Sequence, residues 1–407
     1  MRAGPASIAP GVNRTLRHVA TLCLALLLAA PALAAAPSGM AMDVLDSITK
    51  SPASRREGST GTDFSKTGAG KAGAGPAAPT APVAPVVPGA LAPSTQALPQ
   101  RQEAPAAQPV SPAPAAKQHS APQVLTLTHD GAERRALITQ PKLQARKKGQ
   151  AAPLLPVIIF LHGAGGSAAQ AMRQTNLAAR AAAAGFLAVF PEGLGPAEAK
   201  GEGQTWNAWR CCGYARDARV DDVGFLSVLV NRLRQDYRAD PERIHLAGFS
   251  NGAMLASRFA LERPGVAATL VSVAGYLPCD APKPTEALPV LIVHGDRDQV
   301  ARFAPTAAHP ATGRFCEDHP ARAQADFWVQ NLDLAPAPKV RETAAARVEE
   351  SAPGKKGGRG FLRFVIVKGG GHAWPGGPRE RFRYCDAPSS GVDATGLLLE
   401  FCAGRRR

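Results

Sequence analysis

Large hydrophobic side chains are scarce in the first third of this 407-residue chain. Between Pro37 and Pro122 there is one aromatic residue, Phe64, whereas 14 of the chain's 37 prolines fall in this stretch. Ordering a backbone costs about 1–2 kcal/mol per residue, and burial of so few apolar groups cannot offset that cost. The composition excludes a packed N-terminal domain, and we expect residues 37–122 to be a disordered Pro/Ala-rich linker.

No apolar run in the sequence is long enough to span a bilayer, which takes about 20 residues. The run Val19–Ala30 follows Arg14 and Arg17 and precedes the small residues at 32–36. Positive charge, a short apolar run and then small residues are typical of a secretory signal. We therefore predict a signal peptide at 1–36, no membrane span and a secreted protein, extracellular or periplasmic; an uncleaved anchor is the alternative.

Cysteine is also sparse, with seven residues, one of them inside the predicted signal. The remaining six are an even number, as expected in an oxidising compartment. A bond between the adjacent Cys211 and Cys212 would be strained, so we expect one of them to pair with Cys279, and Cys385 to pair with Cys402. No C-x-x-C or His/Cys cluster occurs, so we predict no metal and no cofactor.

Acidic residues are fewer than basic ones, with 32 Asp and Glu against 47 Lys and Arg and a formal net charge of +15. Small basic clusters lie at 355–359 and 405–407. Neither clusters with aromatic residues nor belongs to a nucleic-acid-binding motif. We expect a basic, solvated surface and no nucleic-acid partner; attraction to an acidic polysaccharide or an anionic envelope surface is the alternative.

The 285 residues from Gln123 to Arg407 are enough for one sizeable core. Gln123–Thr128 and Arg135–Thr139 flank an Asp130-Gly131 turn, which predicts an antiparallel hairpin at a sheet edge. Short, nearly continuous apolar runs follow, as in strands buried on both faces: Val157–Leu161, Phe186–Phe190, Ile244–Ala247, Leu270–Ala274, Val290–Val293 and Phe361–Val367.

Segments with helical periodicity lie between most of these runs: Ser167–Ala184, Val220–Tyr237, Asn251–Arg263 and Arg322–Asn331. Strands that alternate with helices predict an α/β fold, with a mostly parallel central sheet flanked by helices. Ligands of such sheets bind at the carboxyl ends of the strands, so we expect the catalytic residues there.

A G-x-S-x-G sequence, Gly248–Gly252, lies between the predicted strand Ile244–Ala247 and a predicted helix. The turn from strand to helix is so tight that it holds Ser250 in a strained backbone geometry, and the flanking glycines avoid clashes. The hydroxyl is exposed at a helix N-terminus, whose dipole favours developing negative charge. We predict that Ser250 is a nucleophile; a chance turn is the alternative.

Two carboxylates compete for the role of a histidine-orienting group in the segment His294–Asp298, directly after the predicted strand Val290–Val293. We choose Asp298, because it lies further into the loop and can turn back over the site. Asp296 is the alternative, although its type favours a turn that bonds its own backbone. His294 is expected to pack at the strand end.

The glycine-rich loop Lys368–Gly377 follows the last predicted strand and presents His372, which we predict to be the general base. The chain order Ser250, Asp298, His372 is that of an α/β-hydrolase triad. Four other histidines lack this placement: His162, His245, His309 and His319.

A tetrahedral oxyanion needs N–H donors fixed in advance. The first buried strand runs into the glycine-rich segment His162–Gly166, where this fold supplies one donor. We assign the Ala164 N–H, with Gly165 as the alternative, and the Asn251 N–H after the nucleophile. A phosphate-binding loop is disfavoured because the sequence G-x-x-x-x-G-K-[ST] is absent.

Taken together, these residues resemble the secreted polyhydroxybutyrate depolymerase/feruloyl esterase family. The resemblance extends over about Gln123 to Gly377 and rests on His162-Gly163, Thr205-Trp206-Asn207, Cys211-Cys212, Val220–Phe225, Gly248–Gly252, His294-Gly295-x-x-Asp298 and His372-x-Trp374-Pro375-Gly376. It implies an α/β-hydrolase catalytic domain at 123–407 and a serine carboxylesterase acting on aliphatic polyester or on feruloyl and acetyl esters of plant polysaccharide. The insert Ala335–Gly360 and the Arg-rich tail depart from the family pattern.

Outside the triad, we expect Trp374 to form a wall of the substrate pocket, with packing in the core as the alternative. Trp206 and Trp209 lie where an aromatic platform would fit, with core packing as the alternative. Asp221 and Asp222 precede a predicted helix, which indicates an N-cap.

We therefore predict a two-step acyl transfer to water on an ester substrate, polymeric in kind. A peptidase or acyltransferase with the same triad, and a non-catalytic secreted polymer-binding protein, are the alternatives.

Overall fold

The computed structural model describes residues 121–142, 152–197, 203–356, 358–379 and 385–407. The predicted signal at 1–36 lies outside these ranges, as does nearly all of the predicted linker at 37–122. Among the described residues, no helix combines the length and apolar character that a bilayer crossing requires.

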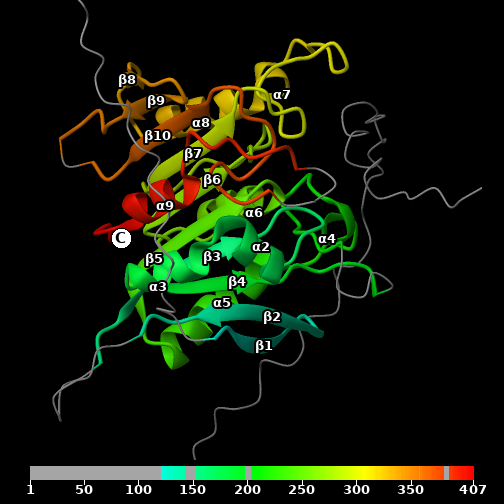
Figure 1. Cartoon of the computed structure of the whole chain (residues 1–407), viewed down its shortest axis with the longest axis vertical. Helices are drawn as coiled ribbons and strands as arrows, with labels where there is room; N and C mark the ends of the chain where they lie inside the picture. Colours follow the sequence, from blue (N-terminus) through cyan, green and yellow to red (C-terminus); the bar gives the residue numbers. More distant parts are fainter. Residues whose placement is uncertain (1–120, 143–151, 198–202, 357, 380–384) are drawn as a thin grey trace, which may run out of the picture. The chain divides into compact units, whose positions relative to one another are not determined.

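The described strands form one ten-stranded sheet, in the order β1-β2-β4-β3-β5-β6-β7-β10-β9-β8 (Figure 1). In chain order they are β1 (Gln123–His129), β2 (Ala132–Thr139), β3 (Leu155–Leu161), β4 (Leu187–Pro191), β5 (Ala239–Phe249), β6 (Thr269–Val273), β7 (Pro289–Gly295), β8 (Lys339–Glu342), β9 (Ala346–Ser351) and β10 (Phe361–Val367). The six central strands, from β4 to β10, are parallel, and two antiparallel strands extend the sheet at each edge. The mostly parallel sheet and the N-terminal hairpin were predicted, and both predictions are confirmed.

The hairpin β1–β2 turns at Asp130 and Gly131, whose φ angles are 50° and 72°. Two consecutive positive φ angles make the type of two-residue turn whose twist matches that of the flanking strands. The register His129↔Ala132 follows directly from this turn.

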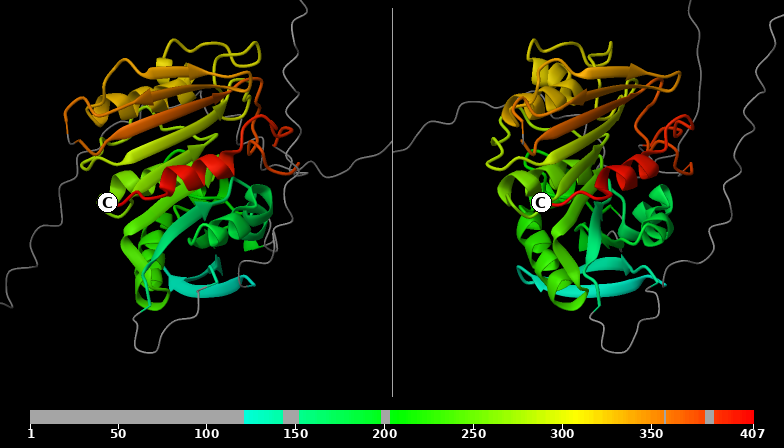
Figure 2. Two further views of the ribbon diagram at one scale, coloured as in Figure 1. Left: turned by 60° about the vertical axis from the view of Figure 1, so that its left-hand side comes forward. Right: turned by 90° about the vertical axis from the view of Figure 1, so that its left-hand side faces the viewer.

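Helices cover both faces of the sheet (Figures 1 and 2). The described helices are α2 (Ala168–Thr175), α3 (Leu177–Ala183), α4 (Gly213–Asp217), α5 (Asp222–Asp236), α6 (Asn251–Glu262), α7 (Phe315–Asp318), α8 (Pro320–Asn331) and α9 (Ala394–Cys402). Helices α5, α6 and α8 pack on one face, and α2, α3 and α9 on the other. Apolar side chains of the strands, such as Phe160, Phe190 and Val293, are fully buried beneath these layers.

One predicted helix is two in the structure. The segment Ser167–Ala184 was expected to be continuous, but Asn176 adopts a left-handed backbone (φ 50°, ψ 25°) that ends α2 before α3 begins. Asparagine tolerates this conformation better than most residues. The Ser167 side chain caps the start of α2 by accepting from the Gln170 N–H.

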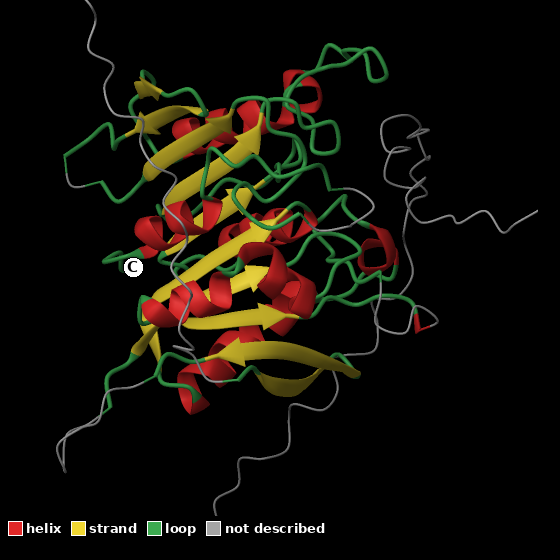
Figure 3. Cartoon of the chain, viewed as in Figure 1, coloured by secondary structure: helices red, strands yellow, loops and turns green. Residues whose placement is uncertain are grey.

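The insert Ala335–Gly360 contains the antiparallel strands β8 and β9, which extend the sheet next to β10 (Figure 3). Neither strand was predicted, because both sequences are polar. β8 lies at the edge of the sheet and is exposed along its whole length. The short helices α4 and α7 and the C-terminal α9 were also not predicted.

Candidate active site

Ser250 lies at the sharp turn between β5 and α6, with φ 53° and ψ −123°. A non-glycine residue held at such a positive φ is strained, and the surrounding structure must compensate. The turn brings backbone segments so close that a Cβ at Gly248 would clash with the Gly252 backbone, and one at Gly252 with the carbonyl oxygens of Leu161 and His162. The two glycines of the G-x-S-x-G sequence are therefore required by close approach.

His372 is held at its backbone as well as at its ring. Its N–H donates to Asp386 Oδ2 at 2.6 Å, and its carbonyl accepts from the Asp386 N–H at 2.9 Å. A Cβ at Gly371 would clash with the Asp386 carboxylate, so this position is also closed to larger residues. The His372 ring packs against Phe249, with 5.0 Å between ring centroids.

The structure brings Ser250, Asp298 and His372 together. The imidazole lies between the other two side chains, with Nε2 3.0 Å from Ser250 Oγ and Nδ1 2.8 Å from Asp298 Oδ2. Asp298 and His372 are each 2% exposed, whereas Ser250 is half-buried. A hydroxyl that reaches solvent beside an imidazole shielded from it can be deprotonated as it attacks a bound carbonyl.

The geometry also separates the two competing aspartates. Asp298 Oδ2 faces the imidazole, while Oδ1 accepts from the N–H groups of Val300 and Ala301, both at 2.8 Å. Asp296 Oδ1 instead accepts from the Gly369 N–H at 2.7 Å. Asp298 orients the His372 ring, and Asp296 anchors the start of the loop that carries it.

Two residues of this network were not predicted to take part. His294 Nε2 lies 2.6 Å from the Ala301 carbonyl oxygen and 3.4 Å from Asp298 Oδ2, so it holds the loop that carries Asp298. The position of His294 at the end of a predicted strand was the one feature of the sequence that could have indicated this contact. Asp386 has no such signal, because nothing in its local sequence indicates that it meets His372.

The predicted oxyanion donors follow two neighbouring parallel strands, β3 and β5. The Gly165 N–H donates to the Gln204 carbonyl at 2.7 Å. This N–H is therefore not available to an oxyanion, which argues against Gly165 as the alternative to Ala164. Ala164 follows β3, and Asn251 is the first residue of α6.

The two tryptophans assigned to the substrate pocket are buried among protein groups. Trp374 is 2% exposed, packs edge-on against Phe160 and donates from Nε1 to Thr395 Oγ1 at 2.9 Å. Trp206 is fully buried and donates from Nε1 to the His162 carbonyl at 2.9 Å. Their contacts are those of packing residues and give no support to a pocket wall.

The predicted disulfide pairing is wrong. Cys279 is bonded to Cys316, because the loop after β6 meets α7, and Cys211 is bonded to Cys212. Cys402 forms no disulfide: its Sγ lies 3.5 Å from Thr269 Oγ1, and burial raises its thiol pKa to about 12.

The paired aspartates at the start of α5 divide into two roles. Asp221 is the N-cap, as predicted, and accepts from the Gly224 N–H at 2.9 Å and from His129 at 3.0 Å. Asp222 is buried and pairs with Arg134 at 2.6 Å, a contact that the sequence did not indicate. Within the described ranges, no group of three or more His, Cys, Asp or Glu side chains has the arrangement of a metal site.

The sequence pattern of the family described as "Esterase PHB depolymerase" matches residues 146–309. "Putative esterase NocK" of Nocardia uniformis subsp. tsuyamanensis is 32% identical over 238 residues, which are 54% of this chain and 66% of that protein. "Feruloyl esterase B" of Piromyces equi is 27% identical over 224 residues, 54% of this chain and 39% of that protein. This chain thus spans less than two thirds of either relative's length.

Among solved structures, an acetyl xylan esterase from Aspergillus awamori superposes with a TM-score of 0.44 and 15% identity. The superposition covers 62% of this chain and 94% of that one.

Proposed function

We propose that this chain is a secreted serine carboxylesterase of the family described as "Esterase PHB depolymerase", with Ser250, Asp298 and His372 as its triad. The match of that family's sequence pattern to residues 146–309 and the 32% identity to a putative esterase support the family. The observation that carries the proposal is the imidazole of His372, which lies within hydrogen-bond distance of both Ser250 Oγ and Asp298 Oδ2. In an esterase of this kind, one ring nitrogen takes the proton of the serine and the other is held by the carboxylate.

The reaction runs in two steps. His372 Nε2 accepts the Ser250 proton as Oγ bonds to the ester carbonyl carbon, and the resulting oxyanion is held by the N–H groups of Ala164 and Asn251. The C–O bond to the alcohol then breaks as the imidazolium returns its proton to the leaving oxygen. Water, deprotonated by His372, cleaves the acyl-enzyme, releases the acid and restores Ser250. Asp298 keeps the Nδ1 proton in place throughout.

We propose an ester of polymeric origin, either polyhydroxybutyrate-type polyester or a feruloyl or acetyl ester of plant polysaccharide. The family description and the name of the Piromyces relative support this range. Assays on polyhydroxybutyrate granules, methyl ferulate and acetylated xylan, side by side, distinguish the members of the range.

We also propose a signal peptide at 1–36, a linker at 37–122 and a catalytic domain at 123–407. The apolar run Val19–Ala30 behind two arginines supports the first, and the proline-rich composition supports the second. The position of the triad at the carboxyl ends of the central strands supports the third.

The test is Ser250→Ala against a matched Ser257→Ala variant. Ser257 lies in α6, the helix that follows Ser250, is buried, and donates to the Ala253 carbonyl at 2.9 Å. With p-nitrophenyl acetate, Ser250→Ala should lower kcat/KM by at least about 10⁴-fold, because a lost nucleophile is not replaced. Ser257→Ala should stay within a few-fold of the unmodified protein. Near-normal turnover by Ser250→Ala would refute the proposal, as would cleavage of peptides in place of esters.

A further inference from the structure

The two proposed oxyanion donors belong to different segments of the chain. The Ala164 N–H follows β3, whereas the Asn251 N–H begins α6. A donor stabilises the transition state only if it lies about 2.7–3.1 Å from the position that the oxyanion will occupy. Some part of the structure must therefore set the separation of these two segments.

Trp206 contacts both segments. Its backbone N–H donates to Asn251 Oδ1 at 2.8 Å, and its carbonyl accepts from Asn251 Nδ2 at 3.0 Å. Its indole Nε1 donates to the His162 carbonyl at 2.9 Å, two residues before Ala164. One fully buried residue thus joins the segment after β3 to the first residue of α6.

The His162 ring extends this connection to the donor peptide itself. Its Nε2 accepts from the Gly193 N–H at 3.0 Å, which places the ring proton on Nδ1, and Nδ1 donates to the Gly163 carbonyl at 2.8 Å. The Gly166 N–H donates to the same carbonyl oxygen at 3.0 Å. The Gly163 carbonyl and the Ala164 N–H belong to one planar trans peptide and point in opposite directions. Holding the oxygen from two sides therefore aims the N–H.

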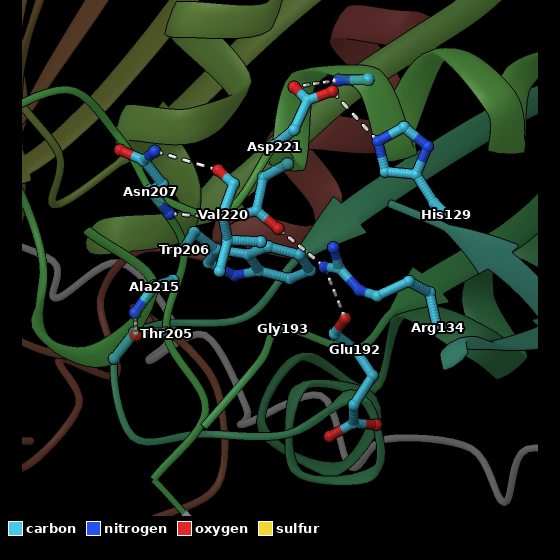
Figure 4. Close-up of polar contacts among 12 residues, drawn as sticks. His129, Arg134, Glu192, Gly193, Thr205, Trp206, Asn207, Ala215, Val220 and Asp221 are labelled. Atoms are coloured by element: carbon cyan, nitrogen blue, oxygen red, sulfur yellow. Dashed lines mark hydrogen bonds and ion pairs between the residues drawn. The ribbon is translucent and has the colours of Figure 1, made fainter. Parts of the chain in front are cut away.

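Trp206 is itself held in place by the His162 ring, by the Arg134 guanidinium and through its neighbour Asn207; Figure 4 shows Arg134 and Asn207 beside it. The His162 ring lies against the indole, with 4.8 Å between centroids, and the Arg134 guanidinium lies 6.0 Å from the indole centroid. Asp222 joins this guanidinium, at 2.6 Å, to the Asn207 N–H, at 2.8 Å. The residue after Trp206 is therefore anchored to a buried ion pair.

We propose that Trp206 is a positioning residue that sets the separation and direction of the two oxyanion donors. It acts through the His162 carbonyl and the Asn251 side chain, and does not touch the substrate. This rests on the proposed esterase function, and it replaces the pocket role that the sequence suggested for the same tryptophan.

The first experiment is Trp206→Phe, which removes the indole N–H and keeps a large ring in the core. With a p-nitrophenyl ester, kcat should fall about 10- to 100-fold, somewhat less than the 10²–10³-fold loss of a complete donor. KM should stay within about threefold, because the ground-state carbonyl depends little on the donors. The inhibition constant of a phenylboronic acid, which forms a tetrahedral adduct on Ser250, should rise in proportion to the loss of kcat/KM.

Trp328→Phe is the matched control. Trp328 is fully buried, like Trp206, but it lies in α8, which packs on β7 and β10, whereas the two donors follow β3 and β5. This variant should keep kcat and boronate affinity within about twofold of the unmodified protein, since no group of the donor network is removed.

If circular dichroism shows that Trp206→Phe is not folded, Asn251→Ala tests the positioning role in its place. It removes both hydrogen bonds to the Trp206 backbone and keeps the Asn251 backbone N–H, so kcat should fall in the same range. Unchanged kcat and boronate affinity in the folded variant would overturn the proposal, and so would a rise in KM alone, which would return Trp206 to the pocket. If the unmodified protein neither hydrolyses esters nor is labelled by an organophosphonate, the proposed function itself fails, and this inference fails with it.

Discussion

Both oxygens of the Asp298 carboxylate are hydrogen-bonded, one by two backbone N–H groups and the other by the His372 ring. The carboxylate therefore has one orientation, and it selects the imidazole tautomer that carries the proton on Nδ1. His294 Nε2 contacts the Ala301 carbonyl of the same loop at 2.6 Å. The hydrogen bond at His372 Nδ1 thus depends on the backbone of Val300 and Ala301 as well as on Asp298.

This arrangement leads to a prediction for Asp298→Asn. An amide keeps the shape of the side chain but can donate to Nδ1, which favours the wrong tautomer, so kcat should fall by about 10⁴-fold with little change in KM. Steady-state kinetics on a p-nitrophenyl ester measure the effect. Asp296→Asn is the comparison: its carboxylate only accepts from the Gly369 N–H, and kcat should fall at least 100-fold less. Equal losses for the two variants would contradict the separation of roles.

At this scale, a catalytic residue could be predicted where a local sequence motif surrounds it. Residues that come together only in the folded structure could not be predicted. Ser250 stands in a glycine-flanked turn and His372 in a glycine-rich loop, so both are visible in the sequence. The choice between Asp296 and Asp298 rested on loop position, and the structure separates them by their partners. Asp386 could not be found, because its contact with His372 is made by a segment without a motif.

At the scale of elements, a buried ion pair connects the N-terminal hairpin to helix α5. Arg134 of β2 and Asp222 of α5 are 2% and 0% exposed, and their side chains lie 2.6 Å apart. The guanidinium also stacks over Phe225, 3.9 Å from the ring centroid. Removal of one partner leaves an uncompensated charge in the interior.

We expect Asp222→Ala to lower the free energy of unfolding by about 3–5 kcal/mol, because Arg134 would remain buried and unpaired. Urea unfolding followed by circular dichroism measures this change. Asp236→Ala is the control, since Asp236 pairs with Arg232 at the surface, where the side chains are 43% and 49% exposed. Its loss should be below about 1 kcal/mol. A small effect at Asp222 would show that the pair adds little beyond its packing.

Elements with a strong local pattern were predicted, and those made by tertiary contact were not. The six buried parallel strands carry continuous apolar runs, and each was located. The strand β8 is Lys-Val-Arg-Glu, entirely exposed, and it is a strand only because β9 lies beside it. The break between α2 and α3 depends on one backbone conformation at Asn176. The order of the strands in the sheet also cannot be obtained from periodicity.

For the molecule as a whole, two buried histidines link stability to pH. Burial lowers the pKa of His162 to about 4 and that of His245 to about 3. Both are neutral in the fold, whereas in the unfolded chain they bind protons below about pH 6.5. The unfolded state thus binds more protons between these values, so stability is lost as pH falls from about 6.5 toward 4.

We predict that the free energy of unfolding falls between pH 7 and pH 5. In the His245→Gln variant, the free energy of unfolding should fall less over the same interval. His245 lies 2.9 Å from Thr269 Oγ1, a contact that the glutamine amide can replace. Urea titrations give the free energy of unfolding of each protein at both pH values. The difference between the two values is compared between the proteins, so a loss of stability that does not depend on pH has no effect on the comparison. Equal differences would show that His245 does not contribute to the acid sensitivity.

The order of the strands in the sheet also determines how far the segment after β10 must reach to bring His372 to Ser250. Strand β10 lies three steps from β5 in the sheet, a lateral distance of about 14 Å at the usual strand spacing. His372 is five residues beyond the end of β10, and five residues reach roughly 17 Å when fully extended. The segment is not extended, because the Gly370 N–H donates to the Val367 carbonyl at 3.1 Å and the chain turns over the end of β7, where the Gly370 carbonyl accepts from the Arg297 N–H at 2.9 Å. The side chain of His372 covers the remaining distance to Ser250. Deletion of one glycine from this turn should therefore separate His372 Nε2 from Ser250 Oγ.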